Sequence, residues 1–91
     1  MLTIAIFGST GSIGSSLLDI IKKNKKDFKI ELLTANKNYK KLLKQAKIFN
    51  VKNLIITDDA AFIITKKMTK NKNINIYNDF NSLKKIFKNN K

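Results

Sequence analysis

One segment of this 91-residue chain, Ile4-Ala5-Ile6-Phe7-Gly8-Ser9-Thr10-Gly11-Ser12-Ile13-Gly14, joins an apolar run to all three glycines of the protein. A second apolar run, Leu17-Leu18-Asp19-Ile20-Ile21, follows it. This order predicts a strand, a glycine-rich turn and a helix. In such a turn the backbone can approach a ligand closely, and the helix N-terminus offers free N–H groups to a pyrophosphate.

The glycines are spaced Gly-x-x-Gly-x-x-Gly rather than Gly-x-Gly-x-x-Gly, but the strand before them and the helix after them are those of a dinucleotide-binding turn. We expect Gly8 to end the strand in a tight turn, Gly11 to let the backbone approach the phosphates, and Gly14 to let the helix pack on the sheet. Thr10 and Ser12 add hydroxyl donors at the mouth of the turn. A P-loop is not expected, because no Gly-Lys-Ser/Thr follows. A purely structural strand-to-helix turn remains the alternative.

The rest of the chain alternates between strands and helices. We expect strands over residues 3–7, 29–34, 53–57 and 74–77. We expect a first helix over 12–24 and later helices capped by Asn38, by Asp58 or Asp59, and by Asp79. Their apolar faces should comprise Ile13, Leu17, Ile20 and Ile21; Leu42, Leu43, Ala46 and Phe49; Ala60, Ile63, Ile64 and Met68; and Leu83, Ile86 and Phe87.

This alternation indicates parallel strands joined by right-handed crossovers. The predicted fold class is α/β: a Rossmann-like, incomplete parallel sheet of about four strands with alternating helices, in one domain over residues 1–91. The spatial strand order should be 4-3-2-1, with the first strand as an exposed edge. The connecting helices should lie on one face of the sheet, so that the other face is bare.

The composition limits the chemistry. The chain has no Cys and no His, which excludes disulfides, Cys/His zinc sites and catalysis by either residue. No apolar run approaches the roughly 18 residues of a membrane span, and Met1 leads into a strand without the basic region of a signal peptide.

The formal net charge is +13, yet all 19 basic residues are Lys, whereas Arg is the preferred reader of phosphates and bases. We interpret the lysines as a solvated surface that attracts an anionic cofactor, with a polyanion site as the alternative.

The end of the second strand reads Thr34-Ala35-Asn36-Lys37-Asn38, where NAD-binding domains usually place Asp or Glu for the ribose 2′-hydroxyl. The nearby carboxylate of Glu31 lies inside the strand. A cation flanked by amide donors suits a 2′-phosphate, which favours NADP over NAD. Lys37 could otherwise be one more surface lysine. Asp58-Asp59 could be a metal pair, but adjacent acidic residues at a helix start are more typical of a cap.

Two runs of the sequence resemble the start of the 1-deoxy-D-xylulose 5-phosphate reductoisomerase family. The first is residues 8–14 leading into Ser16-Leu17-Leu18-Asp19, and the second is residues 32–38 with the following Leu42, Gln45 and Phe49. The resemblance covers essentially the whole chain. It implies that Thr10, Gly11, Ser12 and Ile13 meet the pyrophosphate of NADPH, and that Asn36, Lys37 and Asn38 meet the 2′-phosphate and the adenosine ribose. Gly usually stands in the family where this chain has Asn36, and Asn tolerates a positive φ well enough to keep such a turn.

The resemblance also implies a reaction. The family reduces and rearranges 1-deoxy-D-xylulose 5-phosphate, a phosphosugar, to 2-C-methyl-D-erythritol 4-phosphate in isoprenoid synthesis, with NADPH and a divalent metal, Mg²⁺ or Mn²⁺. It implies a homodimer in the bacterial cytoplasm, with neither nucleic acid nor membrane as a partner. The family's metal-binding carboxylates and substrate site lie beyond residue 91, so we expect cofactor-binding groups here but no catalytic or metal-binding residue and no turnover. A stand-alone NADP-binding sensor and a basic nucleic-acid-binding module are the alternatives.

Overall fold

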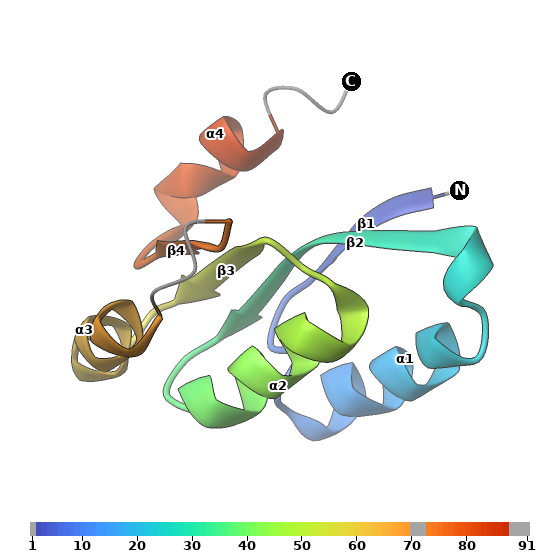
Figure 1. Cartoon of the computed structure of the whole chain (residues 1–91), viewed down its shortest axis with the longest axis horizontal. Coiled ribbons are helices and arrows are strands. Elements are labelled where there is room, and N and C mark those ends of the chain that lie inside the picture. The colour runs from blue at the N-terminus through green and yellow to red at the C-terminus, as the bar shows by residue number, and fades with distance from the viewer. Residues whose placement is uncertain (1, 70–72, 88–91) are drawn as a thin grey trace.

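The computed structural model describes residues 2–69 and 73–87, and Figure 1 shows their arrangement. Its elements are β1 (Leu2–Ile6), α1 (Ser12–Lys22), the short 3₁₀ helix η1 (Lys25–Asp27), β2 (Phe28–Ala35), α2 (Tyr39–Phe49), β3 (Asn53–Ile56), α3 (Asp59–Met68), β4 (Asn75–Tyr77), the 3₁₀ helix η2 (Phe80–Ser82) and α4 (Leu83–Phe87). The strands form one parallel sheet in the order β1-β2-β3-β4. The predicted fold class and strand order are confirmed. The Lys- and Asn-rich stretches at 70–72 and 88–91 lie outside the described residues.

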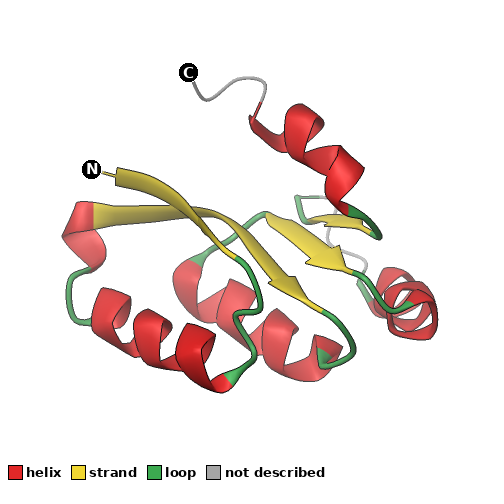
Figure 2. Cartoon of the chain, turned by 180° about the vertical axis from the view of Figure 1, so that it is seen from behind, coloured by secondary structure: helices red, strands yellow, loops and turns green. Residues whose placement is uncertain are grey.

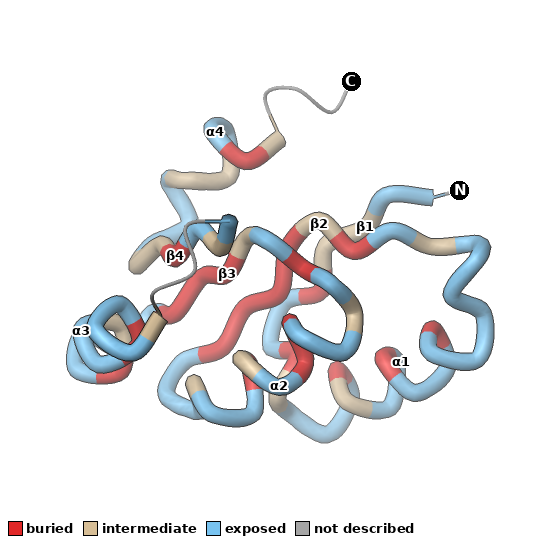
Figure 3. Tube along the Cα trace, in the orientation of Figure 1, coloured by how far each residue is buried: buried red, intermediate tan, exposed pale blue. Residues whose placement is uncertain are grey.

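The two faces of the sheet follow from side-chain alternation along the central strands. Leu33 and Leu54 point into the larger apolar cluster, which α1 and α2 complete, whereas Leu32 and Ile55 point the opposite way. The central strands are apolar on both faces, as strands of a parallel sheet covered on both sides should be. Figure 3 shows the buried residues along β2, β3 and the inner sides of α1 and α2.

The expectation of a bare second face is wrong. After β4 the chain turns to that face, where α4 packs against the sheet, as Figure 2 shows from behind. Ile86 of α4 is buried with Leu32 and Ile55. The ring of Phe80 in η2 also packs edge-to-face on Phe7 after β1, with centroids 5.6 Å apart. Burial of the apolar side chains of α4 against Leu32 and Ile55 holds the helix on this face.

The apolar face predicted for α3 is also wrong, and that for α1 holds only at Ile21, whereas that of α2 is confirmed. In α1 the buried residues are Gly14, Leu18 and Ile21, while Ile13 is 87% exposed. In α3 the buried residues are Ala61 and Thr65, whereas the predicted Ile63, Ile64 and Met68 are exposed. Both helices carry two apolar stripes, so periodicity alone does not determine which stripe is buried. Contact with the rest of the chain decides it, and in α1 that contact is made by Gly14.

The pairing of β1 with β2 contains one irregularity that bears on the glycine-rich turn. Ile4 lies opposite Ile30 and Ala5 lies opposite Leu32, so that one residue of β2, Glu31, is left without a partner on β1. Asn53 stabilises this point because its side-chain amide donates a hydrogen bond to the backbone carbonyl of Glu31 at 3.1 Å. From there on the register brings the end of β1 to the end of β2, where the turn begins.

The described helices also bear on membrane insertion: within residues 2–69 and 73–87, none combines the length and apolarity that crossing a bilayer requires.

We predict that Gly14→Ala lowers the free energy of unfolding by about 2 kcal/mol or more, because overpacking against backbone cannot relax. A Cβ at Gly14 would lie 2.5 Å from the Gly8 carbonyl oxygen and 2.6 Å from the Ser9 Cα. Gly11→Ala is the matched control, since a Cβ there would meet the Gly8 oxygen at 3.4 Å, an ordinary contact. Urea-induced unfolding of the two variants measures the difference. Equal losses of stability would contradict the packing role of Gly14.

Candidate functional site

The glycine-rich turn connects the end of β1 to the start of α1 at the carboxyl edge of the sheet. Gly8 has φ +68°, a left-handed conformation that favours glycine. Its N–H donates to the Thr34 hydroxyl oxygen at 2.8 Å, and its carbonyl accepts from the Gly11 N–H at 3.0 Å. The conformational role predicted for Gly8 is therefore confirmed.

Ser9 is the anchor of this turn. It is completely buried, and elements on three sides bind it. Its N–H donates to the Thr34 carbonyl of β2 at 3.0 Å. Its hydroxyl donates to the Gln45 side-chain oxygen of α2 at 2.8 Å, and its carbonyl accepts from the Gln45 side-chain nitrogen at 2.9 Å and from the Ser15 hydroxyl of α1 at 3.3 Å. The inner half of the turn is thus held in a single orientation.

The outer half of the turn is open to solvent. Helix α1 begins after Gly11 without a side-chain cap, and its first backbone bond runs from the Ser15 N–H to the Gly11 carbonyl at 2.9 Å. The N–H groups of Ser12, Ile13 and Gly14 precede that bond, so they belong to the donors that a helix start leaves for a ligand. A surface depression of about 670 Å³ opens at this point, lined by Ala5, Ile6, Phe7, Gly8, Gly11, Ser12, Ile13, Gly14 and Leu17.

The residues predicted to meet a pyrophosphate come together here. Gly11, Ser12 and Ile13 are exposed at the start of α1, and Thr10 is half-buried beside them. The Lys41 ammonium of α2 donates to the Thr10 carbonyl at 2.9 Å. That bond brings a positive charge from the second βα unit to the turn of the first.

The residues predicted to meet a 2′-phosphate lie in the exposed loop between β2 and α2, at the same edge of the sheet. Asn38 caps α2, since its side-chain oxygen accepts from the Lys41 N–H at 3.3 Å. The Asn36 side-chain oxygen accepts from the Thr57 hydroxyl at 3.0 Å. In the described chain no hydrogen bond or ion pair involves the Lys37 ammonium, which leaves it available to an anion.

Asn36 does not adopt the positive φ that Asn would tolerate. Among the non-glycine residues that the structure describes, only Asn50, after α2, has a positive φ, of 55°. The loop instead turns through hydrogen bonds to the residues that follow β3: the Asp58 N–H donates to the Asn36 carbonyl at 3.1 Å, and the Thr57 hydroxyl binds the Asn36 side chain. A side chain at position 36 therefore fits the fold without backbone strain.

Two residues of the site were not predicted from the pattern: Gln45, which binds Ser9, and Lys41, which binds Thr10. A usable signal existed for Gln45, because a polar residue there falls on the inward face of α2 beside Leu42 and Ala46. Buried polar side chains need partners, so its presence indicates a specific contact. For Lys41 the sequence offers no such signal, because it is one of many lysines in the chain.

The acidic residues take structural positions. Asp58 caps α3 by accepting from the Ala61 N–H at 2.9 Å, which confirms the capping interpretation. Glu31 interacts with Lys29 at 3.8 Å and with Asn53, away from the carboxyl end of β2. Within residues 2–69 and 73–87, no three His, Cys, Asp or Glu side chains gather as metal ligands would. These residues do not fit a divalent metal ion.

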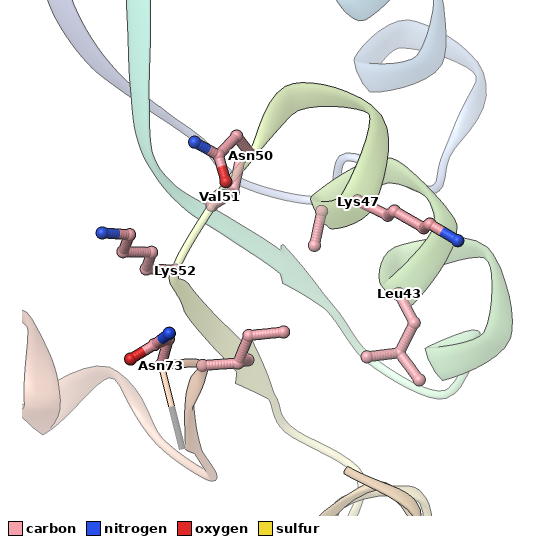
Figure 4. Close-up of a pocket in the computed structure, with 8 residues that line it drawn as sticks. Leu43, Lys47, Asn50, Val51, Lys52 and Asn73 are labelled. Carbon is pink, nitrogen blue, oxygen red and sulfur yellow. The ribbon is translucent and has the colours of Figure 1, made fainter. Parts of the chain in front are cut away.

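A second pocket, of about 420 Å³, lies at the opposite, amino end of the strands (Figure 4). Leu43 and Val51 contribute apolar surface to it, and the side chains of Lys47 and Lys52 extend to different sides. The pocket adjoins the C-terminus of α2, where the helix dipole opposes an anion. Its polar groups do not converge, so the carboxyl edge is the better candidate.

Comparisons with known proteins agree on one family. The family model described as 1-deoxy-D-xylulose 5-phosphate reductoisomerase matches residues 4–91. The reductoisomerase of Pelagibacter ubique (strain HTCC1062) is 66% identical over 90 residues, which are 99% of this chain and 23% of that protein. A reductoisomerase of Clostridium botulinum is 39% identical over 74 residues, which are 81% of this chain and 19% of that protein.

Solved structures agree with the sequence relatives. The reductoisomerase from Zymomonas mobilis in complex with NADPH superposes with a TM-score of 0.80 at 32% identity, covering 92% of this chain and 22% of that one. A reductoisomerase in complex with NADPH, fosmidomycin and magnesium superposes with a TM-score of 0.81 at 28% identity, covering 99% of this chain and 22% of that one. The chain thus spans less than a quarter of the length of these relatives. With a Rossmann-like sheet, a glycine-rich turn at its carboxyl edge and a family model that matches nearly every residue, the chain belongs to the 1-deoxy-D-xylulose 5-phosphate reductoisomerase family.

Proposed function

We propose that residues 1–91 form an NADPH-binding domain, the cofactor-binding part of a 1-deoxy-D-xylulose 5-phosphate reductoisomerase. The observation that carries this proposal is the backbone of Gly11, which has φ −77° and ψ 175°. Any residue can adopt that conformation, and a Cβ there would clash with nothing in the protein. The fold therefore does not require glycine at position 11, whereas close approach of a pyrophosphate does.

The cofactor would lie across the carboxyl edge of the sheet. Thr10, Gly11, Ser12 and Ile13 would face its pyrophosphate, with N–H donors and the positive end of the α1 dipole. The loop of Asn36, Lys37 and Asn38 would face the 2′-phosphate and the adenosine ribose. NADPH supplies a hydride when bound, and the residues of this chain orient it and neutralise its phosphates.

The reaction of the whole enzyme would be the NADPH-dependent reduction and rearrangement of 1-deoxy-D-xylulose 5-phosphate to 2-C-methyl-D-erythritol 4-phosphate, in isoprenoid precursor synthesis. The relatives are about four times as long as this chain, and the described acidic residues do not form a metal site. We therefore assign binding of Mg²⁺ or Mn²⁺ and of the phosphosugar to protein outside these residues, and expect no turnover by residues 1–91 alone.

We further propose a homodimer for the whole enzyme, on the resemblance to the family, and the bacterial cytoplasm as its location, on the bacterial relatives. Neither nucleic acid nor membrane is included among the partners. A sensor that binds NADP without chemistry remains the second candidate, favoured by the ability of the described residues to form the whole carboxyl-edge site.

A chimera separates the enzyme from the sensor. In it, this chain replaces the matching segment of the Pelagibacter ubique reductoisomerase, which is 66% identical. We expect the chimera to oxidise NADPH in the presence of 1-deoxy-D-xylulose 5-phosphate and Mg²⁺. This chain would supply a sheet and a glycine-rich turn that fit the rest of the Pelagibacter ubique enzyme. A chimera with Gly11→Val is the matched control. A folded chimera that binds NADPH but lacks activity would favour the sensor.

We predict that Gly11→Val weakens NADPH binding by about 2 kcal/mol or more, since a branched side chain occupies the space that the pyrophosphate needs. The melting temperature should fall less than in Gly14→Ala, because a Cβ at position 11 meets the Gly8 oxygen at 3.4 Å rather than striking backbone. Calorimetric titration of the chain and of the variant measures the affinities. Equal affinities would mean that Gly11 serves only the turn.

We predict that Lys37→Glu shifts the preference for NADPH over NADH by about tenfold or more, because a charge-assisted contact to the 2′-phosphate is replaced by repulsion. Lys84→Glu is the control, since it changes the net charge equally at an exposed residue of α4. Both affinities are measured at low and at physiological salt, because exposed contacts are screened. An unchanged ratio at both salt concentrations would make Lys37 an ordinary surface lysine.

A further inference from the structure

We propose that Gln45 is a positioning residue for cofactor binding: it orients the peptide between Ser9 and Thr10 so that the Thr10 N–H faces the pyrophosphate. The inference rests on the proposed NADPH site and deepens it. Gln45 lies on α2, is 8% exposed and has no direct access to the depression at the turn. Its effect on a ligand would therefore act through Ser9.

The contact is bidentate. The Gln45 side-chain oxygen accepts from the Ser9 hydroxyl at 2.8 Å, and the Gln45 side-chain nitrogen donates to the Ser9 carbonyl at 2.9 Å. One amide group thereby binds both the side chain and the main chain of a single residue. Two such bonds at good length restrict rotation of that residue more than either bond alone.

The consequence for the turn follows from peptide geometry. A trans peptide unit is planar, and its C=O and N–H point in opposite directions. Because Gln45 holds the Ser9 carbonyl toward α2, the N–H of Thr10 in the same peptide points away from α2. No hydrogen bond in the described part of the chain uses this N–H. It is therefore left as a donor on the side away from α2, and the carbonyl dipole that would repel a phosphate is turned toward α2.

Other bonds keep the turn attached when Gln45 is removed. Ser9 and Gly8 still donate their N–H groups to Thr34, at 3.0 and 2.8 Å. The Ser9 carbonyl and hydroxyl keep only longer contacts, of 3.3 Å to Ser15 and 3.4 Å to the Thr34 carbonyl. Loss of Gln45 should thus loosen the peptide between Ser9 and Thr10 while the sheet and the course of the turn persist.

The test compares Gln45→Met, which keeps the length of the side chain but forms neither hydrogen bond, with Thr65→Val as a matched control. Thr65 is also fully buried, but its hydroxyl donates to the Ala61 carbonyl of its own helix, far along the chain from the turn. Affinities for NADPH and for 2′-AMP are measured with the full 91-residue chain. The second probe carries the 2′-phosphate and the adenosine but no pyrophosphate.

We expect Gln45→Met to weaken NADPH binding by about tenfold or more and to change 2′-AMP binding by less than about twofold, because only the pyrophosphate meets the Thr10 N–H. Thr65→Val should lower the melting temperature without changing either affinity. Ser9→Ala, which keeps the bond to the Ser9 carbonyl, should weaken NADPH binding less than Gln45→Met does. An equal loss for both probes, an equal loss in Ser9→Ala, or a Gln45→Met chain that does not fold would each overturn the positioning role.

A second readout separates this inference from the proposed function. Amide hydrogen exchange, followed by NMR without cofactor, should become faster in Gln45→Met at Gly11, whose N–H donates to the Gly8 carbonyl across the turn, while β2 and β3 stay protected. Unchanged exchange at the turn would contradict the inference even if NADPH binds. Failure of the unsubstituted chain to bind NADPH would contradict the proposed function, and the exchange experiment would still decide the role of Gln45.

Discussion

The attachment of the glycine-rich turn to the end of β2 is the constraint on which the candidate site depends. Two N–H groups, those of Gly8 and Ser9, donate to the hydroxyl and carbonyl of Thr34. These bonds continue the parallel hydrogen bonding of β1 and β2 beyond the last paired residues. The pairing ends there because the chain turns away at Gly8. The start of α1 and the loop after β2 are thereby placed at one edge of the sheet. In the proposed function, a dinucleotide would span those two segments.

The three glycines meet three different physical requirements. Gly8 is needed for a left-handed backbone, and Gly14 because any Cβ would strike the backbone of Gly8 and Ser9. Gly11 is needed for neither reason. A residue that the fold does not explain is a stronger indication of a ligand than one that it does, because its reason has to lie outside the protein. This distinction supports the proposal that Gly11, rather than Gly8 or Gly14, would face a ligand.

Polar and charged groups at the carboxyl edge differ in how firmly they are held. Ser9 and Gln45 are buried and mutually bonded, so they should be rigid on the scale of cofactor binding. Lys37 and Lys41 are exposed; the Lys41 ammonium is bonded to the Thr10 carbonyl, whereas the Lys37 side chain keeps much of its freedom until an anion orders it. The turn would therefore set the position of the pyrophosphate, while the lysines would add charge that salt can screen.

Much of the fold and of the site could be predicted from local pattern. The parallel order of the strands, the caps at Asn38 and Asp58, and the bend at Gly8 depend on residues close together in the chain, so the amino-acid order suffices to predict them. The inward faces of α1 and α3, the packing of α4 on the second face, and the backbone at Asn36 could not be predicted in this way. The last two depend on contacts between distant segments, Ile86 against Leu32 and Thr57 with Asn36, and the inward face of α1 depends on how the folded turn brings Gly14 against Ser9. The bond between Gln45 and Ser9 joins residues 36 positions apart, and only the packing of α2 beside the turn brings them together.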